Sequence, residues 1–321
     1  MAALASLLSA FVPIWLLTAV GYLAGRTGLL GDRAEDVLGR FVLQLAMPAA
    51  LFGLTARTPL SAFANVSLLA FAAGTLLASL LGVAVGRWVF GRRPADQAIG
   101  AMAAGYVNAA NLGIPVAVQV LGDATFIAPV LLFQVLLVTP VILAILEAGT
   151  AGDGRAGRAA GTRTGRLLLL PLRNPVILGA GLGSLVSATG LPLPQAVRHS
   201  CDLLGGAGVP TALLVLGMSL HGRPVAGGTG RPAEIGASVV IKTLVQPLAA
   251  FAAGSLLLHL PDRQLLAVVV CSALPTAQNV FIYARRYELS TVLARKSVLY
   301  STLLSMATLS AATWALGVAP H

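Results

Sequence analysis

Two polar stretches interrupt apolar segments, and they hold the residues best suited to bind a small charged molecule. The first stretch runs over residues 108–115 and the second over residues 272–279, and each contains a proline. Proline has no N–H and clashes with the carbonyl four residues earlier, so each apolar helix is expected to break there. Inside a membrane the freed backbone groups must be buried in protein or line a wet cavity. The two stretches therefore predict a polar site of the kind that broken helices form in transporters.

The chemistry that these stretches favour is the binding of an anion. A helix that restarts within a membrane presents free N–H groups and the positive end of its dipole, which attract a carboxylate. Amide side chains add donors and acceptors without a fixed charge. An alternative is that the amides cap the broken ends and bond between helices. The candidate substrate-binding residues are Asn108, Asn111, Gly113, Pro115, Lys242, Pro275, Gln278 and Asn279.

Lys242 is the one basic residue that lies well inside an apolar segment. A lysine at membrane depth is costly unless it faces a cavity or reaches the interface. One interpretation is that it attracts an anionic substrate. The alternative is that its long side chain extends to the cytoplasmic headgroups. Both interpretations stay open at the level of sequence.

No residue pattern indicates catalysis, a metal or a cofactor. The run from Gly217 to His221 is not the Gly-x-Ser-x-Gly elbow of hydrolases. The four histidines show no metal-ligand spacing, and no Walker motif for ATP is present. The formal charge of +10 is explained by basic residues that flank apolar segments, so nucleic acid is not expected as a partner. We predict a protein that is not an enzyme and needs no cofactor.

The elements that position these residues are transmembrane helices. The chain is 57% hydrophobic and only 10% charged, with a mean hydropathy of +0.88, whereas soluble domains carry about 25% charged residues. Apolar segments long enough to cross a bilayer recur along the whole chain. We predict an all-α polytopic fold of ten spans, expected at roughly 4–24, 37–54, 65–86, 96–121, 125–147, 172–190, 202–220, 234–259, 264–284 and 292–317.

The distribution of basic residues predicts the orientation. Residues 149–171 are assigned to a cytoplasmic connector, which divides the chain into five spans in 1–148 and five in 172–321. With the N-terminus outside, most of the 21 Lys and Arg residues fall in inward loops. Those on the outer side are Arg57, Arg198 and Arg263. The positive-inside rule then predicts a multi-pass protein of the cell membrane with both termini outside.

The two halves carry prolines at matching intervals. Pro48 and Pro115, in the second and fourth spans, are separated almost as far as Pro210 and Pro275, in the seventh and ninth. Because each half has an odd number of spans, the second half is inverted relative to the first. This is the inverted-repeat arrangement of secondary transporters, which places the substrate site at the interface of the repeats.

The residues around the two breaks resemble motifs of the auxin efflux carrier family of permeases. The first is Asn108-x-x-x-Leu-Gly-Ile-Pro115, and the second is Ala273-Leu-Pro-x-x-x-Asn279, followed by Ser301-Thr302-x-x-Ser305. The resemblance covers essentially the full length. The family includes plant auxin carriers and bacterial permeases of malonate or malate type, and it shares its general fold with sodium-coupled bile-acid symporters.

The resemblance implies two inverted five-helix repeats, with broken helices 4 and 9 crossing at mid-membrane. Spans 1, 2, 6 and 7 would form a scaffold, which could support a homodimer, and spans 3–5 and 8–10 a mobile transport part. The expected function is secondary transport of a small organic anion, such as a carboxylate, across the bilayer by an elevator-like motion. One departure is that residues 65–86, the third span, hold no Asp or Glu, where plant carriers have an acidic residue considered for proton coupling.

Two alternatives stay open. The chain could be a sodium-coupled symporter of the bile-acid type, although no acidic residue lies near either break to help hold the ion. It could also be a non-transporting membrane sensor built on the same fold, because fold does not fix function. The identity of the substrate and the direction of transport are not determined by the sequence.

Overall fold

Helices make up nearly all of the chain that the structure describes. The computed structural model describes residues 2–31, 33–58, 65–122, 126–150, 175–221 and 230–316. Within these residues the only extended pairing is a single bridge between Val107 and Thr276. The predicted connector, residues 149–171, lies almost wholly outside the described residues. The all-helical fold class is confirmed for this part of the chain.

The chain divides into two compact units, and both are assembled from distant parts of the sequence. Unit 1 comprises residues 1–16, 64–131 and 223–321, and unit 2 comprises residues 17–63 and 132–222. The division falls within two helices, α1 (Ala2–Thr27) and α7 (Ile127–Phe133). Each unit therefore joins segments from both halves of the chain.

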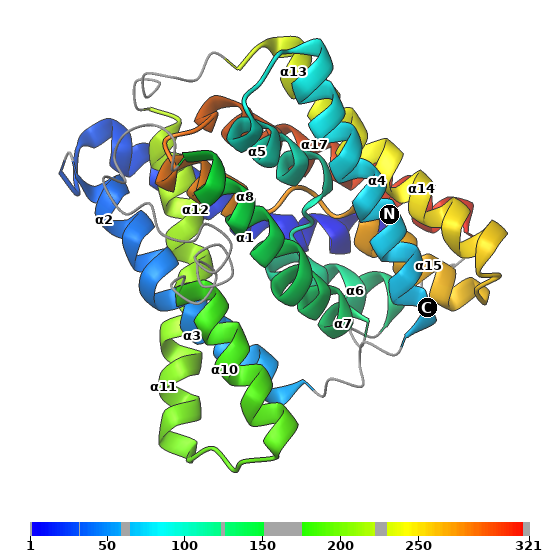
Figure 1. The fold of residues 1–321 in the computed structure, drawn as a ribbon, viewed down its shortest axis with the longest axis horizontal. Coiled ribbons are helices and arrows are strands. Elements are labelled where there is room, and N and C mark those ends of the chain that lie inside the picture. The colour runs from blue at the N-terminus through cyan, green and yellow to red at the C-terminus, as the bar shows by residue number, and fades with distance from the viewer. Residues whose placement is uncertain are drawn as a thin grey trace, which may run out of the picture. The chain divides into compact units, whose positions relative to one another are not determined.

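Unit 1 contains both polar stretches and the helices around them. Figure 1 shows α4 running beside α14, and α15 also packs against these two helices. The helices of unit 1, with π-helical turns marked η, are α4 (Val66–Ala84), η3 (Val85–Val89), α5 (Pro94–Gly105), η4 (Ala109–Gly113), α6 (Ile114–Leu121), α13 (Pro232–Val240), η7 (Ile241–Val245), α14 (Gln246–Ala252), η8 (Ala253–Leu257), α15 (Asp262–Ala273), α16 (Asn279–Arg286) and α17 (Thr291–Ala315).

Unit 2 is built around α3, which packs against both α10 and α11 (Figure 1). Helix α2 packs against α12. The helices of unit 2 are α2 (Ala34–Phe41), η1 (Val42–Ala46), α3 (Met47–Arg57), η5 (Gln134–Val138), α8 (Thr139–Thr150), α10 (Pro175–Thr189), α11 (Gln195–Gly206) and α12 (Gly208–Ser219).

The helices of unit 1 begin at residues that suit helix starts. The N-cap Asn65 accepts a hydrogen bond from the Ser67 N–H at 2.9 Å, which satisfies one of the free donors of α4. Helices α5 and α13 each begin with a proline, whose missing N–H is not needed at the first position. Asp96 and Glu234 follow in the first turns, where a negative charge complements the helix dipole.

Four π-helical turns have a common cause. Each of η1, η4, η5 and η7 directly precedes an α-helix whose second residue is a proline, respectively Pro48, Pro115, Pro140 and Pro247. Proline cannot donate to the carbonyl four residues earlier, so the turn before it widens. At Pro48, Pro140 and Pro247 the helix continues through the widened turn. Only at Pro115 does a true helix break come just before it, at residues 106–108.

Six helical runs in the described residues are long and apolar enough to cross a membrane. They are Ala34–Arg57, Val66–Val89, Ile127–Gly149, Gln195–Met218, Pro232–Leu257 and Thr291–Ala315. Each coincides with a predicted span. The other predicted spans fall on α1, on α10, and on the two interrupted pairs α5–α6 and α15–α16. A multi-pass membrane protein is confirmed, and the total of ten spans stays a prediction.

Candidate functional site

Two interrupted helices of unit 1 form the centre of the candidate site. Helix α5 ends at Gly105, and the chain resumes as a helix at Ala109. Helix α15 ends at Ala273, and the chain resumes as a helix at Asn279. Both predicted interruptions are therefore present, although the first begins before Asn108, ahead of the proline that was expected to cause it.

The two interruptions pair with each other. Val107 and Thr276 form an antiparallel bridge. Its hydrogen bonds run from the Asn108 N–H to the Pro275 carbonyl at 2.8 Å and from the Ala277 N–H to the Tyr106 carbonyl at 3.1 Å. The bridge is deeply buried, because Val107 and Thr276 have almost no exposed surface. Each interruption thus satisfies backbone groups of the other, which would otherwise cost several kcal/mol each in an apolar interior.

Thr276 fixes the pair to its surroundings. Its hydroxyl donates to the Ala103 carbonyl at 2.7 Å, near the end of α5. Its N–H donates to the hydroxyl of Ser301 on α17 at 3.0 Å. Both side chains are fully buried. One threonine therefore connects the second interruption to α5 and to α17.

Lys242 and Gln246 join the carboxyl-terminal ends of α5 and α15. The Lys242 ammonium donates to the Ser272 carbonyl at 3.0 Å and to Gln246 Oε1 at 2.6 Å. Gln246 Nε2 in turn donates to the Gly105 carbonyl at 3.0 Å and to Thr75 Oγ1 at 3.1 Å. Carbonyls at helix ends have no partner within the helix, so the Lys242–Gln246 pair satisfies both broken ends.

The side chain of Lys242 points into the protein. Its exposed fraction is 0%. The interpretation in which this lysine reaches the cytoplasmic headgroups is therefore wrong. The reason is that Ser272 and Gln246 supply oxygen acceptors in the interior, and these replace the water that the ammonium would otherwise seek.

Several buried polar groups of unit 1 lack hydrogen-bond partners among the described residues. The Gln278 side chain is 4% exposed, and among the described residues no group bonds its Oε1. The hydroxyls of Ser272 and Ser297 are likewise buried without a partner in the described part of the chain. Ser297 lies one helical turn before Ser301 on α17. Buried polar atoms of this kind mark places where a polar ligand or water gains hydrogen bonds.

The structure describes most of the predicted site residues. Around the bridge it places the backbone and side chains of Asn108, Lys242, Pro275, Gln278 and Asn279, of which Asn279 is partly exposed. Gly113 is buried, and a Cβ there would lie 3.1 Å from Ile127 Cδ1. The side chains of Asn111 and Pro115 lie outside the described residues.

Sequence reasoning missed several polar groups that hold the site together. Gln246, Thr75, Thr276 and Ser301 received no role, yet all are buried and hydrogen-bonded at the interruptions. One signal was available for Gln246: its spacing of four residues from Lys242 puts both on one face of a helix. Thr75 has no such signal, because its role depends on how α4 packs.

An ion pair and a cap fasten the end of unit 1 where α5 and α13 begin. The Arg92 guanidinium donates to both carboxylate oxygens of Glu234, with Nη2 at 2.6 Å from Oε2. Hydrogen bonding to Glu234 raises the pKa of Arg92 above its ordinary value, although partial burial opposes the shift. Asp96 Oδ1 accepts the Ser290 N–H at 3.0 Å, at the start of α17. These contacts lie outside the interruptions and hold the surrounding helices.

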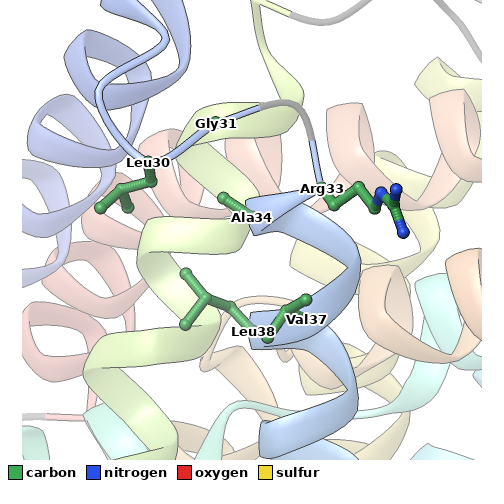
Figure 2. A pocket seen from close by; sticks show the side chains of 6 residues that line it. All are labelled: Leu30, Gly31, Arg33, Ala34, Val37 and Leu38. Carbon is green, nitrogen blue, oxygen red and sulfur yellow. The ribbon is translucent and has the colours of Figure 1, made fainter.

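A surface pocket in unit 2 offers less chemistry. Figure 2 shows its lining residues, and the Arg33 side chain points away from those of Leu30 and Leu38. Arg33 is the one charged residue among them, and Leu30 and Val37 are more than half exposed. Nothing in this pocket combines several buried polar groups, so the paired interruptions are the better candidate site.

Comparison with known proteins identifies the family. Residues 6–313 match the family described as "Membrane transport protein". The chain belongs to this family. The resemblance to the auxin efflux carrier permeases is thereby confirmed over nearly the whole length, and the chain is a multi-pass membrane transport protein.

Relatives with related names span bacteria and plants. A Rhizobium meliloti protein named "Putative malonate transporter" is 27% identical over 305 residues, covering 93% of this chain and 92% of the relative. The Escherichia coli protein "Uncharacterized transporter YfdV" is 24% identical, covering 91% and 92%. The rice protein "Auxin efflux carrier component 3a" is 27% identical over 49% of this chain and 27% of its own length.

Proposed function

We propose that the chain is a secondary transporter that carries a small organic anion, and that the anion binds at the paired interruptions of unit 1. The supporting observation is the pattern of helix ends. The carboxyl-terminal ends of α5 and α15 are satisfied by the Lys242–Gln246 pair. The amino-terminal ends of η4 and α16 follow the bridge directly. Their positive dipole ends are then left to attract an anion.

The side chains of the binding site in this proposal come from both interruptions. Asn108 and Asn279 hold the carboxylate, and Gln278 contributes the amide whose oxygen has no partner in the described residues. Asn111, Gly113, Pro115 and Pro275 shape the helix ends. Lys242 adds a positive charge from behind the bridge. Neutral amides suit a carrier, because a site must release its substrate as well as bind it.

The proposed architecture is ten spans arranged as two inverted repeats, residues 1–148 and 172–321, with the interruptions crossing at mid-membrane. Two observations support it. Helices occupy every predicted span, two of them as interrupted pairs. Each compact unit also draws on both halves of the chain. The orientation with both termini outside follows from the basic residues, and a homodimer through the scaffold spans stays a prediction.

Transport in this proposal is elevator-like. Unit 1, which holds the paired interruptions, moves as one body and exposes the anion to each side of the membrane in turn. The support is that every contact of the interruptions described above lies within unit 1. A site whose contacts all lie within one unit stays intact while that unit moves.

The substrate class that we infer is a small carboxylate of the malonate type. The related Rhizobium meliloti protein bears the name of a malonate transporter, and carboxylates suit helix amino-terminal ends. The first experiment is a thermal-shift screen of the purified protein against small mono- and dicarboxylates, since a bound ligand stabilises the folded protein by mass action. The best ligand then becomes the probe for transport.

Transport is tested by counterflow of the radiolabelled probe in proteoliposomes. We expect Asn108→Ala and Asn279→Ala each to lower uptake at least 10-fold, because lost hydrogen bonds to a charged ligand cost about 1.5–3 kcal/mol. Gln195→Ala, an exposed site in unit 2, serves as the control. Unchanged uptake in both asparagine variants would refute this site, and ligand binding with no flux in the native protein would favour a sensor.

A further inference from the structure

The ammonium of Lys242 is a cation enclosed by oxygen atoms. Its acceptors are the Ser272 carbonyl and Gln246 Oε1, and the buried Ser272 hydroxyl has no hydrogen-bond partner among the described residues. Lys242 forms no ion pair with a described side chain, unlike Arg57 and Arg92, which pair with carboxylates. A buried lysine without a carboxylate partner is rare in a membrane protein.

The helix ends explain why a positive charge is tolerated there. The carboxyl-terminal end of a helix carries about half a negative elementary charge. Lys242 touches this end of α15 directly, and it reaches the same end of α5 through Gln246. One such end contacts the ammonium and the other lies one side chain away, so helix dipoles replace the missing carboxylate.

The acceptors around Lys242 are also of the kind that hold a free cation. Hard cations in proteins are bound by carbonyl, amide and hydroxyl oxygens. The Ser272 carbonyl and Gln246 Oε1 face the ammonium, and the Ser272 hydroxyl belongs to the same residue. Without the lysine side chain, this group of oxygens together with two negative helix ends would favour a small monovalent cation.

We propose that Lys242 is a tethered cation that permanently fills a cation-binding position behind the bridge. The chain therefore needs no sodium or potassium ion at this place to stabilise its interrupted helices. Gln246 is a positioning residue, because it accepts a hydrogen bond from the ammonium and donates one to the Gly105 carbonyl at the end of α5. The contacts of Lys242, Gln246 and Ser272 support this role without the proposed function, to which it adds only that anion transport requires no metal cation at this position.

The proposal is tested by the thermal stability of the purified full-length protein in different salts. The native protein and Lys242→Ala are melted in choline chloride, sodium chloride, potassium chloride and ammonium chloride at equal ionic strength. The native melting temperature is expected to be the same in all four. In choline, Lys242→Ala is expected to have a lower melting temperature than the native protein. Adding at least one of the small cations should raise that melting temperature by roughly 3–6 °C, with an effect that saturates as the cation concentration rises.

Two control variants separate the charge from the volume of the side chain. Lys242→Met fills the space without a charge, so it is expected to melt lower in every salt and to show no recovery. Lys296→Ala removes the only other lysine, which is partly exposed on α17. It is expected to resemble the native protein in all four salts.

The proposal is overturned if Lys242→Ala is as stable as the native protein, or if small cations do not restore it. It is equally overturned if the native protein itself is stabilised by sodium over choline. That last measurement remains decisive should both Lys242 variants fail to fold. Because melting needs no substrate, these results are independent of the transport assay, and either proposal can fail while the other stands.

Discussion

The two units differ in the polar groups that they bury between their helices. In unit 1 the interrupted helices are joined by side-chain hydrogen bonds, such as those of Lys242 and Gln246. Helices approach closely at glycines in both units: in unit 1 a Cβ on Gly82 of α4 would lie 2.7 Å from the Gly100 carbonyl of α5, and unit 2 shows the same close approach. A Cβ on Gly179 of α10 would overlap the Pro48 carbonyl of α3, and Thr55 Oγ1 donates to the Ala180 carbonyl at 3.0 Å.

This difference matters because a membrane offers little hydrophobic driving force between helices. Helices there associate through close packing at small residues or through hydrogen bonds between them. Both units use small residues for close packing. Unit 1 accepts the cost of buried polar groups, and the same groups leave helix amino-terminal ends available for a ligand. The proposed site thus requires a polar interior, and the hydrogen bonds of Lys242 and Gln246 keep that interior from destabilising unit 1.

The largest loss of stability is expected from Gln246→Leu. This change leaves the Gly105 carbonyl and Thr75 hydroxyl without their donor, and it leaves the Lys242 ammonium with one acceptor. Each buried group left without its hydrogen-bond partner costs about 1–3 kcal/mol, and a charged group costs more. The free energy of unfolding in mixed micelles measures the effect, with the exposed Gln195→Leu as the control. A loss below about 1 kcal/mol would show that the network is not essential to unit 1.

A somewhat smaller loss is expected from Arg92→Gln in unit 1. Glu234 has only 4% of its side chain exposed, and the change would leave its carboxylate buried without the guanidinium, at about 2–3 kcal/mol. Glu234 raises the pKa of Arg92, so the stabilisation is complete below the ordinary arginine pKa and is lost only as pH rises through the raised value. The contribution of the ion pair in the native protein should therefore be the same at pH 6 and pH 8, and urea unfolding of both proteins at pH 8 measures the loss. A loss of less than about 1 kcal/mol, as for an exposed pair, would contradict this assignment.

Unit 2 is probed by Gly179→Ala. The added methyl group has no room against the Pro48 backbone, and overpacking of this kind costs about 1–3 kcal/mol. Gly181→Ala on the same helix is a matched control, because nothing lies within 4 Å of its Cβ position. Melting temperature should fall for the first variant alone. The substrate affinity of both variants should equal that of the native protein. A changed affinity would show that packing within unit 2 influences the proposed site in unit 1.

The smallest effect is expected from Arg57→Gln in unit 2. The Arg57 guanidinium approaches Asp202 as closely as Arg92 approaches Glu234, at 2.6 Å. However, the side chains of Arg57 and Asp202 are both about half exposed, at 50% and 49%. Exposed ion pairs contribute about 0–1 kcal/mol. Chemical unfolding should therefore give a smaller loss of stability for Arg57→Gln than for Arg92→Gln. Because the two ion pairs are equally short, burial and not distance would then explain the difference between the two losses.

The sequence predicted where the helices are interrupted, because proline and glycine act locally. Pro275 falls within the second interruption as expected. Pro48 and Pro247 instead widen a turn and leave the helix continuous. A proline alone does not distinguish a bend from a break, since the outcome depends on whether the freed backbone finds a partner. Tyr106 and Asn108 find theirs across the bridge, in a segment far away in sequence.

The side chains of the site were predicted less completely for the same reason. Asn108 is the last residue of the first interruption and Asn279 the first residue of the helix after the second, and both were proposed from local pattern. Thr75 is an ordinary helix residue in its own segment, and Ser301 belongs to a motif of the resemblance that assigns it no contact; the roles of both depend on the packing of α4 and α17. The direction of the Lys242 side chain could not be predicted either, because both water and buried carbonyls satisfy an ammonium.

The pairing of the two interruptions can be tested directly by cross-linking. Residues opposed in an antiparallel bridge lie about 4.5–5.5 Å apart between Cα atoms, which suits a disulfide. Val107→Cys and Thr276→Cys are combined in a chain that lacks Cys201 and Cys271 and carries a protease site within residues 151–174. After oxidation in membranes and cleavage, the account predicts two halves that stay joined until a reductant is added. Halves that separate without reductant, as they must in each single-cysteine control, would contradict it.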